Sequence, residues 1–505
     1  MHVQAASPIP LFTAALTLLC IVWAGSLLPR LSEGTLWQID ECLTAERSRE
    51  MLLLGDYTSV HLYFAPNFNK PPLHYILTTF SMRSIQDPEL AVRIWSLVYA
   101  TASLILTALL YLELRPSKYF EAWMAAAFLA TYAYWIDLSR LALLDAGLAF
   151  YTLLTILCYF KVERQPRWWL GVGAFSILGA LQKIPLPALI VFILLLMQIV
   201  DQKKTFYQEN KSLFRNPYFV AGIILIIFST VGWPLGQMIG HAADYQAMLH
   251  HESERLTGMR GSKNALAHIG YLLLIVQKWL LFGGIALISL LAPIWTRTLR
   301  QNRRYLQLVI VSVAYLTTIS SFVVINRNYM APILPLLAIM GVWWTHGVFN
   351  QRVWLARLIL AAALIASCMV AQKHIQRPTK DYSAQIERLK QLSGMLSDRI
   401  KENVQNKEKN EDARMAYALL AEKKDYESIE SLFQAFAFFY GNIQPEWSRH
   451  LIICKSIDQL NQLPPGRAIY GIARAYRKND LEKQVHAFEV ARDDGEYILF
   501  KGFKK

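Results

Sequence analysis

The stretch IDECLTAERSREMLLLGDYTSVHLYFAPNFNKPPLHY, residues 39–75, follows the first apolar segment and carries an unusual set of polar residues. It opens with an acidic pair, Asp40 and Glu41, and closes with Lys70 followed by two prolines. A residue before a proline is pushed out of the helical conformation, so Lys70 is predicted to lie at a backbone break ahead of an apolar helix. A lysine in such a place can hold a phosphate as a point charge. The role of this stretch depends on which side of a membrane it faces.

The composition is that of a membrane protein. Of the 505 residues, 54% are hydrophobic and 17% are charged, and the mean hydropathy is +0.27. A soluble protein of this length is less apolar. The formal net charge is +14, which in a membrane protein reflects Lys and Arg gathered in cytoplasmic loops and against anionic headgroups. Because no basic stripe with interleaved aromatic residues occurs, nucleic acid is not expected as a partner.

The apolar runs predict about 11–13 transmembrane helices, because a spanning helix needs about 20 mostly apolar residues. The first run lacks a basic n-region and a small-residue cleavage site, which favours a retained helix over a signal peptide. The pair of runs around 168–200 is short and is broken by prolines, and the run 268–296 is long enough to be tilted or split. The predicted spans are 9–29, 91–113, 119–136, 141–160, 168–182, 184–200, 217–239, 268–296, 305–325, 329–349 and 353–372.

Basic residues gather in alternate loops between these spans. By the positive-inside rule the basic loops are cytoplasmic, and the other loops, with the tail, then face the periplasm. The sequence therefore predicts a multi-pass protein of the bacterial inner membrane whose active site and C-terminal domain are periplasmic. The basic loop residues are Arg115, Lys118, Lys161, Arg164, Arg167, Lys203, Lys204, Lys211, Arg215, Arg297, Arg300, Arg303 and Arg304.

The tail differs from the rest of the chain. Charge-rich helical stretches are followed by strand-like runs such as RAIYGIA and EYILFKG. This pattern predicts a small soluble α/β domain over 373–505. The remaining residues, 1–372, form the predicted transmembrane domain, which includes the outer loop 30–90.

The outer side of the predicted helices holds nearly all the unusual ionisable residues. Such residues are costly in a membrane and by default indicate function. Carboxylates can supply a base, and cations can stabilise a phosphate leaving group. Together they predict group transfer from a phospholipid-like donor. The candidate residues are Asp40, Glu41, Lys70, His74, Arg140, Asp145, Lys183, His250, His251, Arg255, Arg327 and Tyr329.

Several motifs, in order along the chain, resemble the ArnT/protein-O-mannosyltransferase superfamily of GT-C glycosyltransferases. Residues 39–75 resemble the first outer loop of that superfamily, which opens with an acidic "DE" and closes with a "KPPL" segment. The other matching segments are RLALLDAGLAFY at 140–151, LQKIP at 181–185, HHESERLTG at 250–258, NRNYMAPILPLLAI at 326–339 and SLFQAFAFFYG at 431–441.

The resemblance implies a GT-C fold and an inverting transfer of a sugar from a polyprenyl-phosphate carrier to an acceptor outside the membrane. It implies that Asp40 is the essential carboxylate and Asp145 the second acid. It also implies that Lys70, Arg255 and Tyr329 hold the lipid phosphate. The further candidates are Glu41 for the catalytic group and Lys183, Arg327, Arg140 and His74 for donor binding.

An undecaprenyl-phosphate-linked sugar is the expected donor, and a lipid A-type glycolipid that receives an aminoarabinose-like sugar is the expected outcome. The chain departs from aminoarabinose transferases at Asn69, where they usually carry Glu, and at Thr44, where they usually carry Tyr. Transfer to a protein or glycan hydroxyl is the alternative, and there Asp40 must act as a general base.

A polytopic transporter or flippase is the alternative of a different class. It would place ionisable groups near the bilayer midplane, often within inverted repeats, and neither feature is found in the sequence. A divalent metal ion stays open, with His250 and His251 as candidate ligands, although no HxxxH or HExxH spacing surrounds them. We expect a monomer.

Overall fold

The computed structural model forms two compact units. The first comprises Met1–Leu31, Phe68–His74 and Arg93–Arg377, and the second comprises Ser32–Asn67, Tyr75–Val92 and Pro378–Lys505. The predicted division between 1–372 and 373–505 stays a prediction. The described residues are 8–36, 39–201, 215–243, 245–246, 248–250, 270, 273–277, 279, 281–320, 327–377, 384–407, 415–420, 435–448, 451–454, 457–493 and 497–505.

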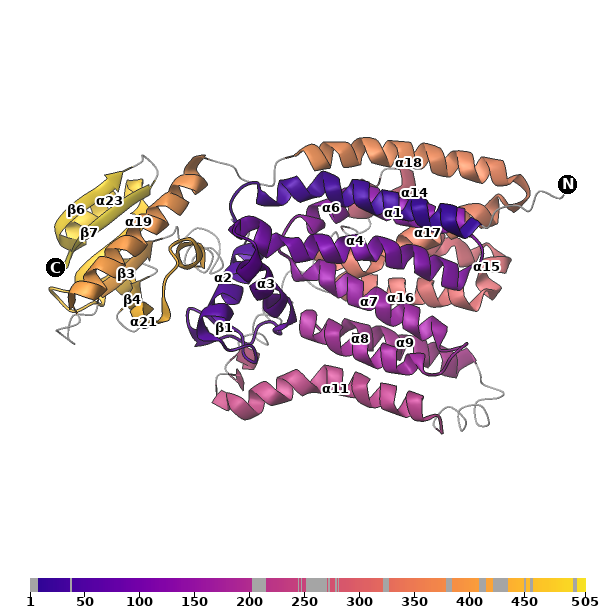
Figure 1. The fold of residues 1–505 in the computed structure, drawn as a ribbon, viewed down its shortest axis with the longest axis horizontal. Coiled ribbons are helices and arrows are strands. Elements are labelled where there is room, and N and C mark those ends of the chain that lie inside the picture. The colour runs from indigo at the N-terminus through magenta and orange to yellow at the C-terminus, as the bar shows by residue number, and fades with distance from the viewer. Residues whose placement is uncertain are drawn as a thin grey trace. The chain divides into compact units, whose positions relative to one another are not determined.

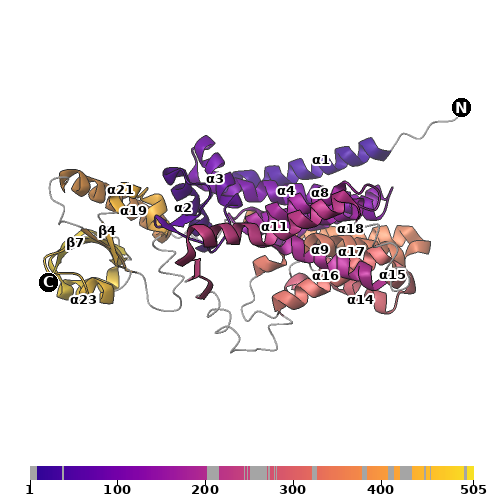
Figure 2. The same cartoon turned by 90° about the horizontal axis from the view of Figure 1, so that it is seen from below.

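The first unit is a bundle of helices that run side by side in two perpendicular views (Figures 1 and 2). Each predicted span overlaps a helix of the described residues. The elements are α1 (Pro8–Leu27), α4 (Pro88–Leu114), α5 (Tyr119–Thr131), α6 (Ala133–Ser139), α7 (Leu144–Lys161), α8 (Trp168–Gln182), α9 (Leu186–Asp201), α11 (Pro217–Gly240), α14 (Leu281–Leu291), α15 (Arg297–Gln301), α16 (Arg303–Ser320), α17 (Leu334–Val348) and α18 (Val353–Gln376), with short 3-10 helices η1 (Leu28–Ser32), η3 (Ala292–Ile294), η4 (Arg327–Ile333) and η5 (Asn350–Arg352).

Among the described residues, six helices are long and apolar enough to cross a membrane. Three shorter apolar helices lie within 168–182, 186–197 and 281–294. The six helices are Pro8–Ser32, Pro88–Leu114, Leu144–Lys161, Pro217–Gly240, Arg327–Val348 and Asn350–Gln376.

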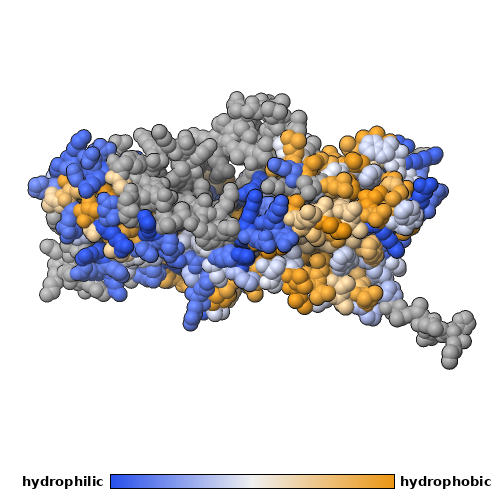
Figure 3. All heavy atoms as spheres, turned by 90° about the horizontal axis from the view of Figure 1, so that it is seen from above, coloured by the Kyte–Doolittle hydropathy of each residue, from blue (hydrophilic) through white to orange (hydrophobic). Residues whose placement is uncertain are grey.

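These helices differ in how much of their surface the protein itself covers. The apolar windows of α7 and of the η4–α17 segment are 83% buried, whereas those of α1 and α11 are only 22% and 17% buried. Apolar side chains on the outer helices, such as Leu11 (77% exposed) and Ile239 (79% exposed), therefore cover the surface of the bundle, which is largely apolar in Figure 3. Apolar side chains exposed over whole helices suit contact with lipid rather than with water.

Close packing in the bundle depends on glycine where α8 meets α11. A Cβ atom built on Gly222 would lie 2.6 Å from the backbone oxygen of Trp169, and one on Gly173 would lie 2.9 Å from the backbone oxygen of Gly222. Small residues at such crossings let two membrane helices approach closely. The two helices are therefore held by backbone contact as well as by side chains.

The second unit begins with the predicted outer loop. Its helix α2 (Ile39–Leu54) is followed by a short hairpin of β1 (His61–Leu62) and β2 (Ala65–Pro66), and α3 (Leu73–Ser84) comes next along the chain. Both hairpin turn residues, Tyr63 and Phe64, have φ of 60°, as a type I′ turn requires. Their backbone N–H groups donate to the two carboxylate oxygens of Glu50 at 2.6 and 2.8 Å. The turn is thus fixed by a side chain of α2.

The C-terminal part of this unit is a small α/β domain, as predicted. Its sheet has the strand order β4-β3-β5-β7-β6, in which β3 is parallel to β4 and β5, and β7 is antiparallel to β5 and β6. The elements are α19 (Ala384–Lys407), β3 (Met415–Leu420), α21 (Pro445–Ser448), β4 (Leu451–Cys454), α22 (Ile457–Asn461), β5 (Ala468–Arg474), η6 (Ala475–Arg477), α23 (Lys478–Gln484), β6 (Val485–Asp493) and β7 (Tyr497–Lys504).

Candidate active site

Three of the predicted site residues meet in the first unit. Lys183 follows the last residue of α8, and Asp145 lies in the first turn of α7. The Lys183 Nζ donates to Asp145 Oδ1 at 2.7 Å, and the two side chains are only 13% and 5% exposed. The same ammonium lies 5.3 Å from the centroid of the Tyr329 ring. The fold therefore gathers an acid, a cation and a phenol from three separate sequence motifs.

His74 is linked to this cluster through the side chain of Gln182. It is fully buried, and its Nδ1 lies 3.1 Å from Nε2 of Gln182, the residue before Lys183. That amide also donates to the backbone oxygen of Leu144, the residue before Asp145, at 3.2 Å. Burial lowers the pKa of His74 to about 4, so the imidazole is neutral at pH 7. His74 can position Gln182 but carries no charge for a phosphate, and its predicted part in donor binding stays a prediction.

Gln182 was missed by the sequence analysis, although it stands inside the quoted LQKIP segment. Its place depends on Gly147, because a Cβ atom there would lie 2.2 Å from Gln182 Nε2 and 2.9 Å from the Tyr99 ring. A helix position that faces a buried amide so closely accepts only glycine. A glycine inside the helical part of the acidic motif was the signal that could have indicated this contact.

Gly147→Ala should therefore push the Gln182 amide away from His74 and from the Leu144 carbonyl. Overpacking a buried site costs about 1–3 kcal/mol, which should lower the midpoint of thermal unfolding in detergent. Gly236→Ala is the matched control, since nothing lies within 4 Å of a Cβ atom at that helical glycine. Equal midpoints for the two variants would refute the close contact.

Two predicted arginines have different surroundings. Arg327 is exposed, and its Cζ lies 5.4 Å from the centroid of the Tyr134 ring; the hydroxyl of that tyrosine donates to the neighbouring Asn328 side chain. Arg140 is buried and donates to the backbone oxygens of His374 and Arg377, at 2.9 Å each. These contacts satisfy carbonyl groups at the C-terminal end of α18. Donor binding by Arg140 and Arg327 stays a prediction.

Lys70 lies where the sequence predicts it, in a bend directly before α3. Its side chain is half-buried, and both prolines after it are buried. The helix begins at Leu73, immediately after the second proline. The predicted backbone break is confirmed, and phosphate binding by Lys70 stays a prediction.

The two residues of the acidic pair, both in the second unit, differ in solvent exposure. Asp40 is exposed in the first turn of α2, whereas Glu41 is 1% exposed. Within the described part of the chain, no group forms a hydrogen bond or an ion pair with the Asp40 carboxylate. Its backbone oxygen accepts a hydrogen bond from the Thr44 hydroxyl at 2.7 Å. Asp40 is therefore available to a ligand, while Glu41 faces the interior.

The rest of α2 buries charges that the sequence analysis did not single out. Arg49 donates from two nitrogens to the two carboxylate oxygens of Glu46, at 2.8 Å each. Burial and the nearby Glu46 raise the pKa of Glu50 to about 9. Arg47 is 6% exposed and donates to the Tyr75 hydroxyl at 3.1 Å. The sequence signal was the run 46–50, in which four of five residues are charged. Charged side chains that are buried need partners, and the fold provides them here.

The candidate residues of the segment HHESERLTG are mostly outside the residues that the structure describes. Arg255 and His251 lie outside the described residues, and His250 is an exposed residue in a helical segment. Among the residues that the structure describes, no three His, Cys, Asp or Glu side chains lie close enough together to hold a metal ion. The structure thus adds no ligand set to the metal hypothesis.

Comparison with known proteins supports the motif analysis. Residues 69–233 match the family model described as dolichyl-phosphate-mannose-protein mannosyltransferase. The undecaprenyl phosphate-alpha-4-amino-4-deoxy-L-arabinose arabinosyl transferase 2 of Sodalis glossinidius is 29% identical over 196 residues, which cover 37% of this chain and 35% of that protein. A transferase of the same description from Yersinia enterocolitica is 27% identical over 165 residues, or 32% of this chain and 29% of that protein. The matched region thus spans about a third of the length of these relatives.

Two solved structures extend the similarity to almost the whole chain. The crystal structure of ArnT from Cupriavidus metallidurans in the apo state superposes with a TM-score of 0.65 over 98% of this chain and 97% of the other, at 15% identity. The same protein bound to undecaprenyl phosphate gives a TM-score of 0.64 over 98% of both chains.

The fold class predicted from the sequence is confirmed. The chain is a multi-pass α-helical membrane protein with a small C-terminal α/β domain and the fold of the ArnT structures. The family resemblance predicted from the motifs is also confirmed, since residues 69–233, which include Lys70, Asp145 and Lys183, match the mannosyltransferase family model.

Proposed function

We propose that this protein is an inverting glycosyltransferase that moves a sugar from a polyprenyl-phosphate donor to an acceptor on the periplasmic side of a bacterial inner membrane. The observation that carries the proposal is the Asp40 carboxylate, which is exposed and free of partners among the described residues, on a helix whose other charged side chains are buried. A carboxylate kept available on a rigid helix is what a base or an orienting group requires.

Two cations of the first unit are the proposed ligands of the donor phosphate. Lys70 lies at its backbone break, and Lys183 lies beside Tyr329 and is already paired with Asp145. A cation beside the phosphate stabilises the negative charge that develops there as the bond between the sugar and the phosphate breaks. The similarity to an ArnT structure bound to undecaprenyl phosphate supports a polyprenyl phosphate as the carrier.

The reaction follows from these roles. An acceptor oxygen attacks the anomeric carbon from the face opposite the phosphate, the bond between that carbon and the phosphate oxygen breaks, and its electron pair leaves with the lipid phosphate. When the acceptor is a hydroxyl, its proton passes to Asp40. When the acceptor is a phosphate group, it is already ionised, and Asp40 orients the donor instead. The names of the relatives favour an aminoarabinose-like sugar, and the acceptor that we propose is a lipid A-type glycolipid.

Titration of undecaprenyl phosphate against purified variants tests donor binding. A hydrogen bond to a charged group contributes about 1.5–3 kcal/mol, so Lys70→Ala should weaken binding by about ten- to a hundredfold. Lys70→Arg should restore part of the affinity, because a planar fork does not replace a compact ammonium held at a rigid break.

Lys118→Ala is the control, since Lys118 caps α5, is 48% exposed and lies as far as 3.9 Å from the Glu121 carboxylate. It should bind undecaprenyl phosphate as the wild type does. Equal affinities for the wild type, Lys70→Ala and Lys70→Arg would mean that Lys70 is an interfacial anchor and would remove it from the donor site.

A further inference from the structure

The residue Tyr440, in the helical segment 435–440 of the C-terminal domain, bonds to two distant parts of the predicted outer loop. Its hydroxyl accepts from the backbone N–H of Leu36 at 2.9 Å and donates to Glu89 Oε1 at 2.8 Å. Lys390 Nζ donates to the same carboxylate oxygen at 2.9 Å and lies 4.7 Å from the Tyr440 ring centroid. One hydroxyl thus fixes the chain just before α2.

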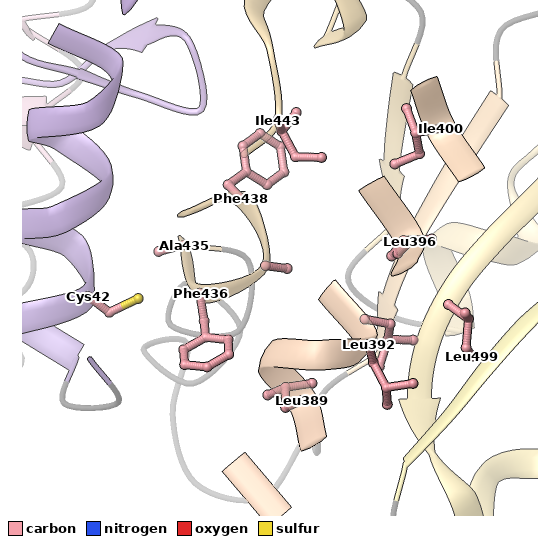
Figure 4. Close-up of a cluster of buried hydrophobic side chains, with 12 residues drawn as sticks. Cys42, Leu389, Leu392, Leu396, Ile400, Ala435, Phe436, Phe438, Ile443 and Leu499 are labelled. Carbon is pink, nitrogen blue, oxygen red and sulfur yellow. The ribbon is translucent and has the colours of Figure 1, made fainter. Parts of the chain in front are cut away.

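A second attachment lies just after Asp40. Cys42 is fully buried and belongs to a hydrophobic cluster with Leu389 and Phe436. Figure 4 shows the Cys42 side chain directed toward the segment that carries Ala435 and Phe436. Two turns further along α2, Arg49 donates to the backbone oxygen of Ile443 at 2.7 Å. These contacts hold α2 along one side of its length.

The two attachments bracket the catalytic candidate. Leu36 and Cys42 are both 0% exposed, whereas Asp40 between them is exposed. Successive residues of an α-helix are turned by about 100°, so burial of Cys42 on one side sets the direction in which Asp40 points. Residues 435–443 take part in both attachments.

We propose that residues 435–443 of the C-terminal domain position the Asp40 carboxylate, and that Tyr440 is a positioning residue for sugar transfer. The proposal rests on the proposed function only in that Asp40 takes part in the reaction. It gives the C-terminal domain a role in the chemistry, because the direction of a catalytic group must be held closely for a rate to be maintained.

Tyr440→Phe tests this with little change in packing, since the ring keeps its neighbours and only the hydroxyl is lost. Hydrogen exchange measured by mass spectrometry on the full-length protein should become about tenfold faster in peptides that contain Leu36, because the N–H loses its acceptor. The kcat for transfer from the undecaprenyl-phosphate-linked sugar should fall about tenfold, with the donor KM unchanged. Tyr470→Phe is the matched control: its ring packs against the same cluster, and its hydroxyl makes no hydrogen bond within the described residues.

A double-mutant cycle separates positioning from general stability. In an Asp40→Glu background, Tyr440→Phe should lower kcat by much less than tenfold, because the carboxylate is already misplaced. A tenfold loss in both backgrounds, or unchanged exchange at Leu36, would overturn the positioning role while leaving transfer by the wild type intact. A wild-type protein that transfers no sugar, combined with faster exchange at Leu36 in Tyr440→Phe, would instead contradict the proposed function and keep the attachment.

Discussion

Asp40→Asn is expected to lower the rate of sugar transfer by about 10²- to 10⁴-fold, the range for loss of a catalytic base or orienting carboxylate. The substitution removes the charge and nearly keeps the shape. Because Asp40 is exposed and bonds to the described residues only through its backbone oxygen, expression and thermal stability in detergent should match the wild type. The measurement is transfer from an undecaprenyl-phosphate-linked sugar to lipid A, followed by mass spectrometry of the product.

Asp398→Asn is the control for this experiment, since Asp398 is an exposed carboxylate on α19 of the same unit. It should transfer at the wild-type rate. Near-normal transfer by Asp40→Asn would exclude the catalytic assignment, and an equal loss in both variants would show that the effect is one of surface charge. Omitting lipid A and supplying a protein or glycan acceptor in the same assay separates the two proposed acceptor classes.

Lys183→Ala is expected to destabilise the protein by about 3–5 kcal/mol, because it leaves the Asp145 carboxylate buried without its cation. The pair is joined at 2.7 Å and is almost closed to solvent, with exposures of 13% and 5%. Thermal unfolding in detergent should show the loss directly. Lys183→Met combined with Asp145→Leu should recover most of the stability, because replacing a buried pair with apolar side chains of similar size is often neutral.

A surface ion pair of the same unit gives the comparison. Arg304 and Glu163 form an ion pair whose side chains are 26% and 50% exposed, and breaking such a pair costs about 0–1 kcal/mol. Glu163→Gln should therefore leave the unfolding midpoint almost unchanged. If Lys183→Ala were as mild as Glu163→Gln, the Asp145–Lys183 pair would not be buried as described.

The membrane helices and the break at Lys70 follow from the sequence alone. Each long apolar run must form its backbone hydrogen bonds within itself when it lies in lipid, so hydropathy and length predict helices directly. The start of α3 at Leu73 is equally local, because two successive prolines restrict the residue before each of them. The motifs also carried the family resemblance, since their residue types and order are visible without a fold.

The partners of the site residues were decided by the tertiary structure. Asp145 pairs with Lys183 across 38 positions of sequence. His74 is neutral because the fold buries it beside Gln182. Hydropathy reports how apolar a segment is, but not which segment crosses it, and ion pairs and pKa shifts arise where segments cross. For the same reason the bond from Leu36 to Tyr440, 404 positions away, exists only because the chain folds back on itself.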